Sequence, residues 1–199
     1  IATRISLWLC VLIPALGVTP RVSAAEGKTP KASSPFDIPF EKYILPNGLE
    51  VILHQDASLP LCAVNIWYHV GPSNEPPGRS GFAHLFDHLM FEGSKHAGHD
   101  FDRLMESVGA TNVNGTTSWD RTNYFETVPR QELELALWLE SDRMGFLLDA
   151  LTPARLEVQR DVVKNERRQH YEKPLDGPSE LARFQALFSP NHPYHGAVI

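Results

Sequence analysis

The chain has 199 residues, of which 42% are hydrophobic and 21% are charged. This is ordinary globular composition, with length enough for one substantial domain and its core but not for two. The formal net charge of −6 disfavours a nucleic-acid partner, because backbone phosphates repel an acidic chain.

Residues 1–25 have the pattern of a bacterial export signal. Arg4 precedes an apolar run at residues 7–16, and residues 22–25 are the small residues that a signal peptidase requires. The alternative is a transmembrane anchor, but the run is shorter than the roughly 20 residues that span a bilayer. We therefore expect a periplasmic or secreted protein with no transmembrane span. Without this signal peptide, 16 basic and 24 acidic side chains remain, a net charge of −8.

The residues after the signal predict a linker and then a folded domain. Residues 26–39 are rich in Lys, Ser and Pro with almost no apolar periodicity, as in a flexible lead-in, and the domain is expected over residues 40–199. Because the sequence starts at Ile1 rather than Met and stops at Ile199 without a polar tail, we expect a piece of a longer protein, truncated at its C-terminal end.

Residues 43–45 and 49–53 predict a β-hairpin around Pro46-Asn47-Gly48, where Asn-Gly supplies the positive φ values of a tight turn. A third strand is predicted at residues 61–69. It contains Cys62 in an apolar run, and we expect this cysteine to be a small core residue. After signal removal no second cysteine remains, so an intrachain disulfide is excluded.

Helices and strands are both predicted after the Gly- and Pro-rich break at residues 71–78. A helix opens at Ser80, and segments rich in Thr, Tyr, Phe and Val indicate two further strands. The predicted helices cover residues 100–108, 130–148 and 153–171, and the two strands cover residues 112–118 and 122–128. Together these elements predict an α+β domain with a mixed or antiparallel sheet and helices packed on it.

His84, Asp87 and His88 form the constellation that carries chemistry. On the helix that opens at Ser80, the two histidines are four residues apart and project from one face, where they can bind one zinc ion. Asp87 is placed to accept a proton from a water on the ion without ligating it, as a general base does. The alternative is three polar residues on a solvated helix face, so a metal site needs a third ligand.

Glu166 is the candidate third ligand. It follows Leu156 and Val163 at the 3.6-residue spacing of one helix face, so we expect it to point where they point. A carboxylate turned towards a core costs several kcal/mol unless it is paired, protonated or bound to a metal. The histidine pair could be that partner. A salt bridge to a later arginine of the chain is the equally open alternative.

Three stretches resemble a known family. Residues 81–94, with His84-Leu-Phe-Asp87-His88, look like the inverted zinc motif His-x-x-Glu-His of the pitrilysin, insulysin and mitochondrial processing peptidase family. Residues 162–166 are similar to the segment with the family's third zinc ligand, and residues 114–124 resemble its Asn-Ala-x-Thr-Ser strand beside the active site. The similarity extends from about Phe40 to the end of the sequence.

By this resemblance, one zinc ion per domain is held by His84, His88 and Glu166, and Asp87 occupies the position of the general base. Asn114 is implied to hold substrate backbone. Its polar strand suits a sheet edge that pairs with an extended peptide, although the residues alone allow an ordinary solvent-facing edge. Family members enclose unfolded peptides between two similar halves, so a second half or partner subunit that supplies an Arg and a Tyr is also implied.

Two departures from the family's pattern bear on the chemistry of the site. Asp87 stands where the family has Glu, which withdraws the carboxylate by roughly 1.5 Å. A misplacement of about 1 Å can cost on the order of 10²-fold in rate. Gln159 stands where the family commonly has Glu, so the hydrogen bonding around the zinc ligands is expected to differ. None of the three implied ligands is altered, and zinc binding is therefore expected to survive both changes.

The sequence thus predicts a zinc-dependent endopeptidase that hydrolyses peptide bonds of unfolded peptides. The ion would polarise the scissile carbonyl, and Asp87 would take the proton of the attacking water. Two alternatives stay open. One is a weak or inactive family member that serves as a partner subunit, and the other is a secreted domain that binds peptides by strand addition without turnover.

Overall fold

The structure is a computed structural model that describes residues 5–9, 38–76, 78–99, 101–175 and 177–195. Of the expected export signal and linker, only residues 5–9, 38 and 39 are among these, and the rest of both predictions lies outside the described residues. Within the described ranges, no helix combines the length and the apolar character needed to cross a membrane.

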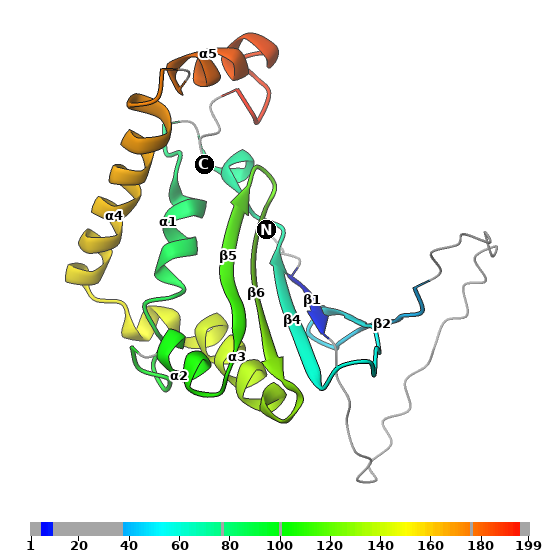
Figure 1. Cartoon of the computed structure of the whole chain (residues 1–199). Helices are drawn as coiled ribbons and strands as arrows, with labels where there is room; N and C mark the ends of the chain where they lie inside the picture. Colours follow the sequence, from blue (N-terminus) through cyan, green and yellow to red (C-terminus); the bar gives the residue numbers. More distant parts are fainter. Residues whose placement is uncertain (1–4, 10–37, 77, 100, 176, 196–199) are drawn as a thin grey trace, which may run out of the picture.

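Six strands form one sheet in the order β2-β3-β1-β4-β6-β5 (Figure 1). Every neighbouring pair is antiparallel except β1 and β3, which are parallel, so the sheet is mixed and the α+β prediction is confirmed. The strands are β1 Ile5–Leu9, β2 Glu41–Ile44, β3 Glu50–Leu53, β4 Leu61–Tyr68, β5 Thr111–Ser118 and β6 Arg121–Pro129.

Strand β1 was not predicted as a strand. Ile5–Leu9 falls in the expected export signal, yet the structure pairs it with both β3 and β4 inside the sheet. The apolar run of a leader and that of a fully buried strand have the same composition, and periodicity does not separate them. The export signal itself stays a prediction.

Helices gather beside the β5 and β6 side of the sheet, and the β2–β3 hairpin lies at its other end (Figure 1). A helix was predicted at each of the first four positions below, whereas α5 was not. The helices are α1 Phe82–Leu89, α2 Phe101–Ser107, α3 Leu133–Ala150, α4 Pro153–Arg167 and α5 Gly177–Leu187, with a π-helical turn Arg168–Glu172 after α4.

The hairpin turn differs from the predicted one. Gly48 adopts a left-handed φ of 88°, but Asn47 does not have a positive φ. The Asn47 carboxamide oxygen instead accepts the Leu49 N–H at 3.1 Å, while the Leu45 N–H donates to the Leu49 carbonyl at 2.8 Å. Only one left-handed residue is needed because this loop is longer than a two-residue turn.

The core lies between the sheet and α2 and α3. Alternate residues of β4, namely Cys62, Val64 and Ile66, are buried, which confirms the expected core position of the cysteine. Val128 of β6 joins them. The helices contribute Phe101, Met105, Leu133, Ala136 and Leu139.

This arrangement positions the motif helix. Strand β5 is at the sheet edge, as its polar sequence predicted, and α1 lies between β5 and α4 (Figure 1). Helix α1 can therefore present one face to α4 and another to β5.

Candidate functional site

Three side-chain atoms from α1 and α4 form a small triangle. His84 Nε2 and His88 Nε2 lie 3.1 Å apart, and Glu166 Oε2 lies 3.3 Å from each of them. Zinc binds such ligands at about 2.0–2.1 Å in tetrahedral geometry, which separates the ligand atoms by about 3.3–3.4 Å. The donor set fits a zinc ion. Among the described residues it is the group of His, Cys, Asp and Glu side chains that converges closely enough to hold a metal.

The start of α1 is anchored by a residue outside the helix. Gly81 precedes the helix with a left-handed φ of 98° and offers no side-chain cap. Glu75 takes this role, because its Oε2 accepts the Gly81 N–H at 2.7 Å and its Oε1 accepts the Ala83 N–H at 2.6 Å. A carboxylate at a helix N-terminus satisfies orphan donors and complements the helix dipole. Glu75 therefore sets where the helix begins and how its histidine face is turned.

Helix α4 brings Glu166 to this face. The helix begins at Pro153 after Thr152, whose hydroxyl accepts the Arg155 N–H at 3.4 Å. Its apolar side, with Leu156 and Val163, lines a cavity of about 490 Å³ against α1. Leu156 and Val163 thus face α1, the helix with which Glu166 pairs, as the spacing predicted.

Glu166 is less buried than the sequence suggested. Its side chain is 33% exposed, and α4 has no fully buried residue, so it faces a cleft between two helices rather than a core. Helical spacing identifies a shared face but not how closely that face is covered. Of the two partners left open for this carboxylate, the structure pairs it with the two histidines, while Arg167 pairs with Glu172.

The electrostatics suit a metal ligand set. Burial, followed by the neighbouring His88, lowers the pKa of His84, although Glu166 and Asp87 oppose the shift. A neutral imidazole keeps the lone pair that a metal needs. Burial raises the pKa of Asp87, against the opposing effects of the Thr117 hydrogen bond and the two histidines. A carboxylate with a raised pKa takes up a proton more readily.

Asp87 is turned towards β5. The side chain is 8% exposed, and its Oδ2 accepts a hydrogen bond from the Thr117 hydroxyl at 2.8 Å. His84, His88 and Glu166 would hold a metal ion, which would supply Lewis acidity, and the Asp87 carboxylate on the same helix could accept a proton.

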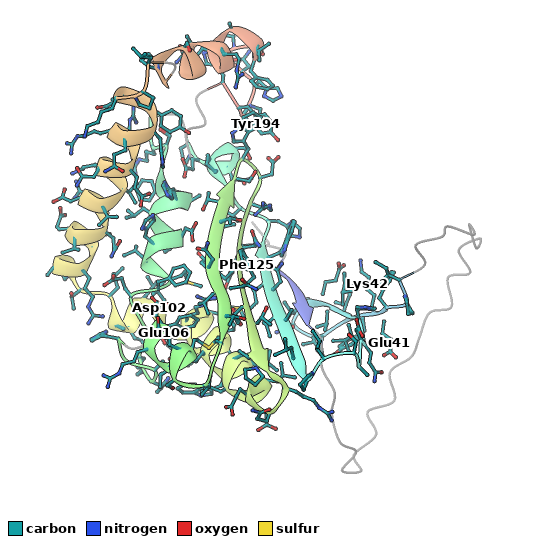
Figure 2. The ribbon with its side chains drawn as sticks, in the orientation of Figure 1. Glu41, Lys42, Asp102, Glu106, Phe125 and Tyr194 are labelled. Atoms are coloured by element: carbon teal, nitrogen blue, oxygen red, sulfur yellow. The ribbon has the colours of Figure 1, made fainter. Side chains whose placement is uncertain are left out.

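The contacts of the two remaining sequence candidates, Asn114 and Gln159, are with residues outside the triangle. Asn114 is exposed on β5, where its carboxamide oxygen accepts the Gly115 N–H at 2.9 Å. It borders a cavity of about 330 Å³ that also contacts Asp102 and Glu106 of α2, which lie close together beside β5 in Figure 2. Gln159 donates through Nε2 to Glu92 Oε1 at 2.5 Å, so its contact is with the segment after α1.

Several structural contributors were missed from the sequence. Glu75 lies in the Pro-rich break, where no periodicity relates it to the helix that begins seven residues later. Thr117 lies on the strand that was predicted only to bind substrate, and its hydrogen bond to Asp87 was not predicted. Asp142 on α3 accepts hydrogen bonds from the Ser94 hydroxyl and from two loop N–H groups at 3.1 Å each, which ties the segment after α1 to α3. The sequence has no local signal for such long-range contacts.

The chain is similar to several known proteins. A family model described as insulinase (peptidase family M16) matches residues 50–190. Zinc protease PqqE of Helicobacter pylori is 34% identical over 167 residues, which are 80% of this chain and 35% of that relative. Subunit 1 of the mitochondrial cytochrome b-c1 complex of Rattus norvegicus is 30% identical over 62% of this chain and 25% of its own length.

A solved structure has the same fold. The crystal structure of a protease from Helicobacter pylori is similar with a TM-score of 0.73 and 32% identity, over 79% of this chain and 38% of that one. The chain therefore spans about a quarter to a third of the length of the relatives named zinc proteases that it matches. Because the family model covers most of the sequence, the chain belongs to the insulinase family, peptidase family M16.

Proposed function

We propose that this chain is the zinc-binding part of an endopeptidase that hydrolyses unfolded peptides. One zinc ion is held by His84, His88 and Glu166, and Asp87 acts as the general base. The observation that carries the proposal is the triangle of three donor atoms, with sides of 3.1, 3.3 and 3.3 Å, in a family whose members include named zinc proteases.

A zinc ion in this site would supply Lewis acidity at the scissile carbonyl and lower the pKa of a bound water. His84 and His88 bind as neutral imidazoles, so the site with one carboxylate ligand keeps about one net positive charge. Asp87, which follows His84 by three residues, accepts the proton of the attacking water and returns it to the leaving amine. Glu75 holds the helix that carries all three of these residues.

Strand β5 is the proposed binding edge for substrate. An edge strand presents one row of backbone groups to an extended peptide, which favours unfolded substrates over folded ones. Asn114 on this strand is the proposed contact to substrate backbone. By the family resemblance, a second homologous half or partner subunit supplies an Arg and a Tyr. The leader pattern of residues 1–25 supports a periplasmic or secreted location.

The second candidate is a catalytically weak member that serves as a partner subunit or binds peptides. The observation that favours it is the Asp87 carboxylate, which is shorter than a glutamate, almost buried, and hydrogen-bonded by Thr117. If this contact holds the base about 1 Å from its working position, the rate falls on the order of 10²-fold.

The deciding experiment measures cleavage of a quenched unstructured peptide by the full-length mature protein with any partner subunit. We expect turnover that a chelator abolishes, with one zinc per protein. Glu166→Gln should abolish both metal and turnover, whereas Glu157→Gln, an exposed carboxylate on the same helix, should change neither.

Two outcomes would contradict the proposal. Zinc bound without turnover, with activity appearing only in Asp87→Glu, would establish the second candidate. Turnover that persists without metal would rule out the zinc site as the catalytic centre.

A further inference from the structure

Both oxygens of the Asp87 carboxylate meet strand β5. Oδ2 accepts a hydrogen bond from the Thr117 hydroxyl at 2.8 Å. Oδ1 occupies the space beside Gly115, where an added Cβ atom would lie only 2.3 Å from it. A hydroxyl donor and an absent side chain, two residues apart on one face of the strand, together form a cradle for this carboxylate.

The glycine at this position is required by space rather than by backbone conformation. Gly115 is not among the residues with positive φ, so its backbone accepts an alanine. An added Cβ would also lie 3.1 Å from ring atoms of Phe91 and Tyr124. The guanidinium of Arg143 is 5.5 Å and 4.4 Å from the centres of these rings, and its side chain is 1% exposed and paired with Glu140.

Among the neighbours of this added Cβ, the carboxylate oxygen is the closest, at 2.3 Å against 3.1 Å for the two ring atoms. A contact of 2.3 Å requires a neighbour to move, whereas one of 3.1 Å requires a shift of only a few tenths of an ångström. If a methyl group is added at Gly115, the carboxylate of Asp87 is the group that must move.

We propose that Gly115 and Thr117 are positioning residues that hold the Asp87 carboxylate against β5 and so set its place relative to the metal triangle. This inference rests on the proposed function only for its catalytic consequence. Strand β5 would then both bind the peptide and hold the Asp87 carboxylate. The distance between the peptide and this carboxylate would therefore be set by one strand.

A double-mutant cycle, with Tm of the full-length protein as the readout, tests the contact between Gly115 and Asp87 without reference to activity. Gly115→Ala should lower Tm in the native background, and this loss should shrink by at least half in an Asp87→Ala background, because only the carboxylate clash is relieved there. Gly145→Ala on α3 is the matched control, since its Cβ would meet nothing within 4 Å. An equal loss from Gly115→Ala in both backgrounds would overturn the proposal.

A second comparison tests the hydroxyl. Thr117→Val should lower kcat about 10-fold with KM and zinc content unchanged, because the base is misplaced but the peptide still binds. Thr117→Ser should retain activity within about 2-fold, and Thr127→Val, on β6 and outside the proposed binding edge, should behave as native. If the serine variant loses as much as the valine variant, or if only KM changes, Thr117 does not position the base. A native protein with no turnover contradicts the proposed function, while the melting cycle still decides the contact.

Discussion

The buried carboxylate of Asp142 makes the stability of this protein depend on pH in the acid range. Burial alone would raise the pKa of Asp142, but hydrogen bonds from Ser94 and His96 and from the Ala97 N–H outweigh it and lower the pKa to about 2. The unfolded chain has the ordinary value of 3.8. One pKa unit corresponds to about 1.4 kcal/mol, so the ionised carboxylate contributes about 2 kcal/mol to the free energy of unfolding.

The sign of this contribution follows from the direction of the shift. A group whose folded pKa is depressed stabilises the fold above its unfolded pKa, and the stabilisation is lost as the pH falls through the folded pKa. The full contribution of Asp142 is thus present above about pH 5, about half remains at pH 3, and little is left below pH 2.

Urea denaturation between pH 7 and 3 measures this effect on the metal-free protein. Asp142→Asn should lower the free energy of unfolding by about 2 kcal/mol at pH 7, and its difference from native should narrow by about half at pH 3. Asp161→Asn, an exposed carboxylate on α4, serves as the control and should give no such narrowing. If the difference in free energy of unfolding between the native protein and Asp142→Asn stays constant from pH 7 to 3, the assignment of a depressed pKa to Asp142 is refuted.

Three other perturbations have definite expected outcomes. Glu75→Ala leaves the Gly81 and Ala83 N–H groups without their acceptor, so the free energy of unfolding should fall by about 1–3 kcal/mol in denaturation experiments. Zinc affinity, measured by competition, should fall as well. An unchanged zinc affinity would contradict the anchoring role of Glu75. Burial, and then Glu140, raises the pKa of Glu126 to about 9, so its protonated form favours folding and stability should decline as the pH rises from about 5 to 9. Glu126→Gln should flatten that decline in denaturation curves, and an equally steep decline would contradict the shift. Zinc should raise Tm in native protein but not in His84→Ala, because only a ligand that binds the folded state stabilises it, and an equal rise in both would place the ion elsewhere.

Local features of the sequence predicted much of this fold. The apolar run around Cys62 predicted a strand with this cysteine in the core, and the spacing of His84 and His88 predicted that they share a helix face. The polarity of residues 112–118 correctly predicted an edge strand. Each of these depends on period and composition within one element, which a sequence displays directly.

Features that depend on distant partners were missed or only partly predicted. Nothing within residues 5–9 indicated a place between β3 and β4, since an apolar run is compatible with several structures. Helical spacing placed Glu166 on the right face but overestimated its burial, because burial depends on how closely the neighbouring helix packs.

The sequence by itself determined the chemistry of the site, namely two histidines and two carboxylates in a motif that specifies a family. Only the tertiary structure decided their arrangement. It brought Glu166 to the histidine pair across 78 residues of sequence, and it turned Asp87 into the cradle of Gly115 and Thr117. The physical reason is that the residue types and their spacing along one helix are local properties, whereas the position of a carboxylate is set by whatever the fold packs against it.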